Sequence, residues 1–293
     1  MNSQHRHAVG REPLGVLTRS AREPDLTVRY GDGADQVADV HLPPPAMRSS
    51  GPGGEPPLVI FLHGGFWRAE YGREHTAPLA EALAGAGFAV CAPEYRRTGQ
   101  PGGGWPGTFD DVAVAVDRLP AVVAEAAGGQ AGAGPVVLAG HSAGGHLALW
   151  AAARHLLPAG SPWRAAGAVC RGVVGLAAVS DLATCYRRGL GGQAAGALMG
   201  GGYDQFPDRY GLADPHDLVP AGVPVWLLHG TADDRVPCEM SLSYALRARA
   251  AGAAGTATAT CVLLPGAGHF ELIDPLAAEW PEVVKAVSRA AAG

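Results

Sequence analysis

The chain has 293 residues, 47% of them hydrophobic, which is enough to build the core of one large α/β domain. A net charge of -5 argues against a nucleic-acid-binding surface, and the lack of any apolar run of about 18 residues argues against a membrane span. Five cysteines stand singly, and residues 1–24 carry no apolar signal core, so we expect a cytoplasmic protein. We predict no cofactor and no metal, and we leave a homodimer open.

The order of elements along the chain predicts one α/β domain. Residues 1–25 are expected to form a flexible N-terminal arm, and residues 26–293 a single domain with a cap or substrate-side insertion at 181–219. Strands are expected at 26–30, 36–42, 58–62, 88–92, 172–179, 223–229 and 258–264, and in the run that begins at residue 136. Helices are expected at 76–86, 109–126, 238–251 and 275–292, and from the turn at residue 142 to about residue 156. Because strand and helix alternate from residue 58 onward, the sheet should be mostly parallel, with helices on its faces.

The segment around Ser142 has the Gly-x-Ser-x-Gly pattern of a sharp strand-to-helix turn. An apolar, β-branched run ends in Gly-His-Ser-Ala-Gly at residues 140–144 and continues directly into a helix-forming stretch. Side chains at positions 140 and 144 would collide at so sharp a turn, which explains both glycines. The pattern predicts that the Ser142 hydroxyl projects from the end of the strand as a nucleophile. The plainer alternative is a strand-to-helix turn with no catalytic role.

A serine nucleophile needs a base, and the base needs an acid that orients it. Asp233 stands at the third place after Gly230 in the loop that follows the strand at 223–229, and Asp234 is its rival. His269 lies in the glycine-rich loop that follows the strand at 258–264. The order serine, acid, histidine is that of α/β-hydrolases, and all three residues follow the carboxyl ends of predicted strands. The sequence therefore predicts a triad of Ser142, Asp233 and His269.

The tetrahedral intermediate of acyl transfer carries an oxyanion that needs fixed hydrogen-bond donors. His-Gly-Gly-Phe at residues 63–66 follows a buried strand, and its glycines would let backbone N–H groups approach a substrate oxygen. We expect the donors to be the N–H groups of Gly65, Phe66 and Ala143, with Gly64 beside them. His63 is expected to hold this loop by hydrogen bonds. Residues 95–97 are expected to support it from beneath, and binding of an anionic substrate is their alternative role.

From about residue 27 to its end, the chain resembles the esterase/lipase branch of the α/β-hydrolase superfamily. More narrowly, it is similar to the kynurenine-formamidase-like and feruloyl-esterase-like proteins. The segments that carry the resemblance are 63–67, 94–96, 140–148, 229–237 and 268–270. Relatives of hormone-sensitive lipase usually have an acidic residue before the serine, whereas this chain has His141, which favours the formamidase-like branch.

The predicted function is a serine hydrolase that cleaves small carboxylic esters or aryl amides through an acyl-enzyme. An arylformamidase that cleaves N-formylkynurenine is the narrower alternative, and a non-catalytic hydrolase-fold binding protein is the alternative of another class. We place Phe66, Trp67 and His141 against the substrate. Because two large rings after the oxyanion glycines would leave limited room beside the carbonyl carbon, short acyl groups are expected. The alternative is that both aromatic rings point into the core.

Overall fold

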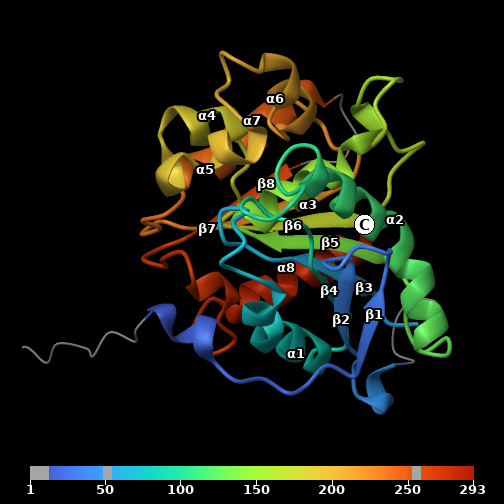
Figure 1. Cartoon of the computed structure of the whole chain (residues 1–293). Coiled ribbons are helices and arrows are strands. Elements are labelled where there is room, and N and C mark those ends of the chain that lie inside the picture. The colour runs from blue at the N-terminus through green and yellow to red at the C-terminus, as the bar shows by residue number, and fades with distance from the viewer. Residues whose placement is uncertain (1–12, 49–54, 253–258) are drawn as a thin grey trace, which may run out of the picture.

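The computed structural model describes residues 13–48, 55–252 and 259–293 (Figure 1). Its strands are β1 (Leu26–Arg29), β2 (Val37–His41), β3 (Leu58–Leu62), β4 (Ala89–Pro93), β5 (Val136–His141), β6 (Gly172–Leu176), β7 (Val225–Gly230) and β8 (Ala259–Leu264). They form one sheet in the order β1-β2-β4-β3-β5-β6-β7-β8. β2 pairs antiparallel with β1 and β4, whereas the pairings from β4 across to β8 are parallel. The parallel strands therefore end at one edge of the sheet, where the loops that follow them meet.

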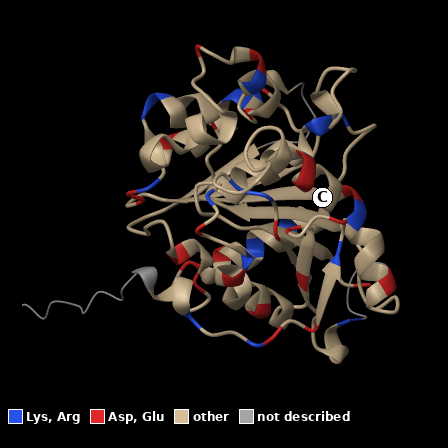
Figure 2. Cartoon of the chain, in the orientation of Figure 1, with Lys and Arg blue, Asp and Glu red and all other residues tan. Residues whose placement is uncertain are grey.

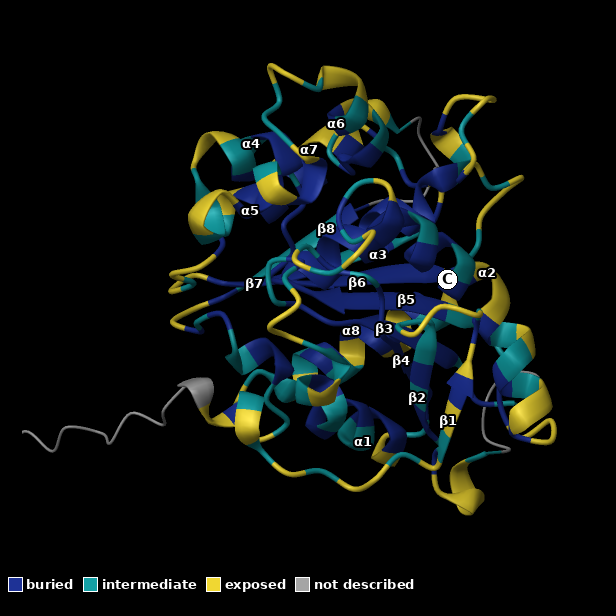
Figure 3. Cartoon of the chain, in the orientation of Figure 1, coloured by how far each residue is buried: buried dark blue, intermediate teal, exposed yellow. Residues whose placement is uncertain are grey.

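Helices cover both faces of this sheet (Figure 1). The longer ones are α1 (Ala77–Gly85), α2 (Gly107–Ala126), α3 (Ala143–Ala152), α7 (Glu239–Ala251) and α8 (Trp280–Ala292). α1 and α8 pack on one face, and α2, α3 and α7 pack on the other. Because side chains alternate along a strand, Leu58, Ile60 and Leu62 join the core beside α2 and α3. Val59 and Phe61 join the core beside α1 and α8, so β3 is buried on both faces (Figure 3).

The expected strands and helices are present with small shifts at their ends, except in three places. The helix predicted from the turn at residue 142 to about residue 156 ends at Ala152, and the 3-10 turn η4 (Arg154–Leu156) follows it. The strand predicted over 172–179 ends at Leu176, because the chain turns there and the Val179 N–H donates to the carbonyl of Ser142 (3.1 Å) instead of to a strand. The helix predicted from residue 275 begins only at Trp280, after the 3-10 turn η5 (Glu271–Ile273). A proline in the first turn of α8 fits this later start. Residue 258, the predicted start of the last strand, lies outside the described residues.

Residues 13–25, the described part of the predicted N-terminal arm, pack against the domain. Pro13–Thr18 form a 3-10 helix, η1, and the Val16 side chain is 2% exposed in the core beside α1 and α8. Arg19 forms a bidentate ion pair with Asp274, in which Nη2 lies 3.0 Å from Oδ2. The buried Val16 side chain and the Arg19–Asp274 ion pair thus hold residues 13–25 against the domain, although their composition is polar and charged. Residues 1–12 of the predicted arm lie outside the described residues.

The segment predicted as a cap or insertion, 181–219, forms three short helices that stand together at the top of Figure 1. They are α4 (Leu182–Arg187), α5 (Leu190–Met199) and α6 (Pro207–Ala213). Asp181 caps α4 by accepting a hydrogen bond from the Thr184 N–H (2.6 Å). The Asp214 carboxylate, just after α6, accepts one from the Ala183 N–H (2.9 Å). The Asp214 carboxylate thereby joins the C-terminal end of α6 to the first turn of α4, whereas Asp181 caps α4 alone.

Acidic and basic side chains are interspersed around the periphery of the molecule, and the central strands β5 and β6 carry neither (Figure 2). Within the described ranges, we find no helix with the length and apolar character that a membrane crossing requires.

His146 in α3 makes the stability of this packing depend on pH. The ring is fully buried, its Nε2 donates to the carbonyl of Ala213 (2.9 Å), and burial lowers its pKa to about 4. The unfolded chain therefore binds a proton at this position between pH 6.5 and pH 4 while the folded chain does not. The free energy of unfolding should fall by about 3 kcal/mol from this residue alone as the pH falls through that window.

Urea unfolding at pH 7 and at pH 4.5 measures this effect, with His146→Gln as the variant that cannot titrate. We expect the wild-type protein to lose more stability than the variant between the two pH values. An equal loss in both proteins would contradict the assignment, because His146 would then carry the same charge folded and unfolded.

Candidate active site

Ser142 occupies a strained turn between β5 and α3. Its backbone has φ 55° and ψ −116°, outside the regions that L-residues usually adopt, and its N–H donates to the carbonyl of Leu176 (2.8 Å). A Cβ atom on Gly140 would lie 2.2 Å from the carbonyl oxygen of Gly144, and one on Gly144 would lie 2.0 Å from that of Leu62. Both flanking glycines are therefore required by close backbone packing, as the sequence predicts.

His269 and Asp233 form a direct pair at the ends of β8 and β7. His269 Nδ1 lies 2.7 Å from Asp233 Oδ2, and Asp233 Oδ1 accepts hydrogen bonds from the N–H groups of Arg235 and Val236, each at 2.8 Å. His229 Nε2 lies 3.2 Å from Asp233 Oδ2. Burial alone would raise the pKa of the Asp233 carboxyl, but the hydrogen bonds with His229 and His269 outweigh burial and hold this pKa below its usual range. Asp233 is therefore an ionised carboxylate at neutral pH.

The rival acid, Asp234, lies elsewhere. Its side chain is 77% exposed, and one of its oxygens lies 3.3 Å from Nε of the neighbouring Arg235. The geometry brings Asp233, and not Asp234, to His269.

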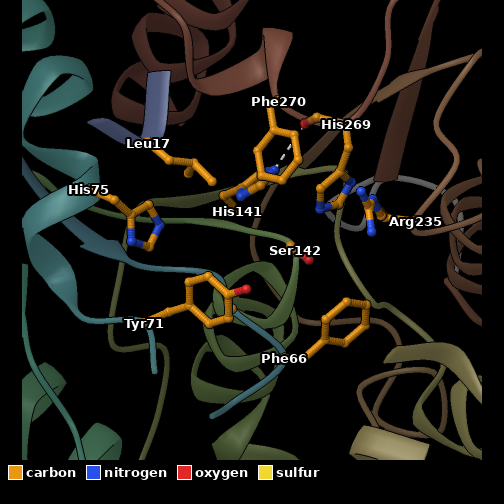
Figure 4. Close-up of a pocket in the computed structure, with 10 residues that line it drawn as sticks. Leu17, Phe66, Tyr71, His75, His141, Ser142, Arg235, His269 and Phe270 are labelled. Atoms are coloured by element: carbon orange, nitrogen blue, oxygen red, sulfur yellow. Dashed lines mark hydrogen bonds between the residues drawn. The ribbon is translucent and has the colours of Figure 1, made fainter. Parts of the chain in front are cut away.

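Ser142 and His269 open onto one cavity of about 120 Å³ (Figure 4). The lining residues are Leu17, Gly65, Phe66, Tyr71, His75, His141, Ser142, Arg235, His269 and Phe270. In Figure 4 the Ser142 hydroxyl lies between two groups of side chains. His269, Arg235 and Phe66 stand on one side of it, and Tyr71 and His75 stand on the other.

The loop after β3 bends through three consecutive residues with positive φ, namely Gly65 (112°), Phe66 (50°) and Trp67 (56°). Gly64 passes against the turn at Ser142, where an added Cβ atom would lie 3.0 Å from His141 Nδ1. Across the part of the chain that the structure describes, the N–H groups of Gly65, Phe66 and Ala143 donate to no other protein group. Phe66 lines the cavity, and Ala143 begins α3 directly after Ser142. These N–H groups remain available to a bound oxygen.

Trp67 is not where the sequence predicts it. The side chain is fully buried in the core, its ring meets His146 edge-on with 5.2 Å between centroids, and it does not line the cavity. Its backbone has a positive φ of 56°, and its ring lies in the core instead of in the cavity where the sequence predicts it. Of the two rings, Phe66 faces the cavity and Trp67 fills the core.

A buried polar group holds the loop from beneath. His63 Nδ1 and Nε2 lie 2.8 Å from the carbonyl of Gly64 and from Glu94 Oε1, respectively, and the ring stacks on Tyr95 with 4.4 Å between centroids. The Tyr95 hydroxyl donates to the carbonyl of His63 (2.8 Å), and Arg97 Nη1 lies 3.1 Å from Glu94 Oε2. These contacts agree with the predicted role of His63 and of residues 95–97 in supporting the loop.

His141 lines the cavity and also positions the neighbouring histidine. Its Nε2 donates to the backbone carbonyl of His269 (3.0 Å), and the two rings lie 4.5 Å apart between centroids (Figure 4). Burial, and then the charge that His269 can carry, lower the pKa of His141 well below its ordinary value. A neutral ring at position 141 avoids placing a second positive charge beside His269.

Several cavity residues carry no motif in the sequence. Tyr71 and His75 follow the loop after β3, and a reader of the sequence could have suspected them only from that position. Leu17 comes from the segment predicted to be flexible, so no sequence signal marks it. Burial and the neighbouring His63 lower the pKa of His75 to about 4, so the ring is neutral at pH 7.

Among the described residues, no group of three or more histidines, cysteines or carboxylates is placed to hold a metal ion.

Comparisons with known proteins place this geometry in a family. The BD-FAE family model matches residues 39–247. The chain is 28% identical to esterase LipC of Mycobacterium tuberculosis (strain ATCC 25618 / H37Rv) over 256 residues, which cover 84% of this chain and 60% of that protein. It is 32% identical to kynurenine formamidase of Salmo salar over 123 residues, which cover 42% of this chain and 36% of that protein. The chain thus spans less than two-thirds of the length of these relatives.

Among solved structures, a truncated form of a carbohydrate esterase from gut microbiota has a TM-score of 0.72 at 19% identity and covers 93% of this chain and 100% of its own. At that identity the likeness concerns the fold, and it confirms the predicted α/β-hydrolase architecture. The family match covers most of the chain, including β3, the turn at Ser142 and Asp233. The chain belongs to the BD-FAE family, within the esterase branch of the α/β-hydrolases.

Proposed function

We propose that this protein is a carboxylesterase that cleaves small esters through an acyl-enzyme formed on Ser142. The observation that carries the proposal is the shared cavity of Ser142 and His269, with His269 Nδ1 2.7 Å from the ionised Asp233. A hydroxyl beside an imidazole that a carboxylate orients is the arrangement that nucleophilic acyl transfer requires.

In this mechanism, His269 Nε2 takes the proton of the Ser142 hydroxyl while Oγ attacks the ester carbonyl carbon. His269 Nδ1–H donates to Asp233, which fixes the tautomer and stabilises the imidazolium that forms. The N–H groups of Gly65, Phe66 and Ala143 bind the oxyanion. His269 then gives its proton to the leaving alcohol. In the second half of the reaction, His269 takes a proton from a water molecule that attacks the acyl-enzyme carbonyl, and the carboxylic acid and free Ser142 are released.

The cavity supports short acyl groups. Its volume of about 120 Å³ suits formyl, acetyl or butyryl groups. Trp67 takes no part in this restriction, because its ring lies in the core. Arylformamidase activity is a second candidate, favoured by the likeness to kynurenine formamidase over 123 residues. A formyl group is the smallest acyl group that the same machinery would transfer.

The first test compares wild-type protein with Ser142→Ala on p-nitrophenyl acetate, butyrate and octanoate and on N-formylkynurenine. The variant should lose about 10⁴-fold or more in kcat, because removal of the nucleophile leaves only binding and the oxyanion donors. An organophosphonate should label the wild-type protein at Ser142 alone. A wild-type protein that cleaves none of these substrates would favour the non-catalytic alternative, and labelling of another serine would overturn the assignment.

A second test separates the two acids. Asp233→Asn should lower kcat about 10³–10⁴-fold, because the amide cannot hold His269 in the tautomer that accepts the serine proton. Asp234→Asn is the matched control, since its carboxylate is exposed and lies beside Arg235, and we expect kcat to change less than about threefold. Steady-state kinetics on p-nitrophenyl acetate measures both, and the reverse order of effects would move the role to Asp234.

A further inference from the structure

We propose that Leu17, from the N-terminal helix η1, closes the acyl side of the cavity and sets the longest acyl chain that the enzyme accepts. The inference rests on the proposed esterase function and goes beyond it, because it assigns a specificity role to a segment far from the triad in the sequence. Leu17 lines the same cavity as Ser142 and His269, and Figure 4 shows its side chain pointing into it.

The position of His269 indicates which side of the cavity would hold the leaving group and which would hold the acyl chain. The histidine must protonate the leaving alcohol, so the leaving group has to lie beside the His269 ring. The acyl chain then extends from the carbonyl carbon to the opposite side of Ser142. In Figure 4 that opposite side holds His75, Tyr71 and Leu17, whereas Arg235 and Phe66 stand on the leaving-group side.

The wall on the acyl side combines polar and apolar groups. His75 belongs to the 3-10 turn η3 (Arg73–Thr76), and η1 packs directly against η3. Phe270, next to His269, also lines the cavity. Leu17 is the one aliphatic side chain among the lining residues, so it is the group that would meet the end of a saturated acyl chain.

Two anchors hold Leu17 in this place. Its neighbour Val16 is 2% exposed in the core beside α1 and α8. Arg19 pairs through two nitrogens with Asp274, which follows η5 and lies five residues after His269. Further along, the Arg22 N–H donates to Glu81 in α1 (3.0 Å). The segment is therefore fixed on both sides of Leu17, and it joins the acyl wall to the loop that carries the histidine.

The test is the ratio of kcat/KM for p-nitrophenyl octanoate to that for p-nitrophenyl acetate, measured in the full chain. Leu17→Ala removes three carbons from the wall, and we expect the ratio to rise about tenfold or more, since one methylene changes discrimination about tenfold or more. Leu17→Phe narrows the same space and should lower the ratio of butyrate to acetate. Leu246→Ala is the matched control, because Leu246 lies in α7 with 65% of its surface exposed.

A second variant tests the same proposal independently, because it loosens the attachment of η1 at a residue that does not line the cavity. Arg19→Gln breaks the bidentate pair with Asp274, and the octanoate-to-acetate ratio should rise in the same direction as in Leu17→Ala. Unchanged ratios in both Leu17 variants, with the wild-type protein active, would overturn the proposal and leave the esterase function standing. A uniform loss on every ester, with the ratio unchanged, would likewise reduce Leu17 to a structural role. Inactivity of the wild-type protein on all the esters would overturn the proposed function itself.

Discussion

The backbone of Ser142 is the constraint on which the rest of the site depends. A residue with a side chain is held at φ 55° and ψ −116°, which costs about 1–3 kcal/mol that the surroundings must supply. They do so by packing backbone against backbone: the carbonyls of Gly144 and Leu62 occupy the space that side chains at 140 and 144 would need. The Ser142 N–H and carbonyl both bond to the chain that leaves β6, so the turn is fixed from two directions. The sheet beneath Ser142 thus holds the backbone of this turn in place.

The loop after β3 meets a second constraint of the same kind. Three successive residues of this loop have positive φ, and two of them, Phe66 and Trp67, are non-glycine residues that seldom adopt such angles, so the loop needs contacts that hold it. The Thr98 N–H and hydroxyl both donate to the carbonyl of Trp67 (2.7 Å each), and Trp67 itself fills the core. Beneath the loop, the pKa of Glu94 stays below its ordinary value, because hydrogen bonding from His63 and the charge of Arg97 outweigh the effect of burial. The carboxylate therefore stays charged and keeps its hold on His63 at neutral pH.

The sequence alone predicts the parts of the site that local chemistry dictates. The strand-turn-helix at Ser142 and the placement of Asp233 and His269 after strands follow from glycine spacing and from the alternation of strand and helix. The direction of Trp67 could not be predicted, because it depends on a backbone angle that a non-glycine residue seldom adopts. Leu17 could not be predicted either, because its place depends on Val16 joining the core cluster beside α1 and α8 and on Arg19 pairing with Asp274, 255 residues further along the chain. Local sequence patterns specify the candidate catalytic groups, and long-range packing specifies the shape of the cavity around them.

The side of the cavity that holds Phe66 and Arg235 also depends both on a local sequence motif and on packing between segments that lie far apart in the sequence. Phe66, which the motif places at the serine, also lies against Gly191 at the start of α5, where an added Cβ atom would come within 2.5 Å of the aromatic ring. Gly191 and Gly192 both have positive φ, and Arg68 donates to the carbonyl of Gly191, so glycine is needed at this contact for conformation and for space. The segment 181–219 thus contacts the Phe66 ring at the cavity through the backbone of Gly191, which has no side chain. Because Phe66 borders the cavity and Gly191 at once, the position of α5 constrains this ring, and under the proposed esterase function α5 would determine the room left for the leaving group.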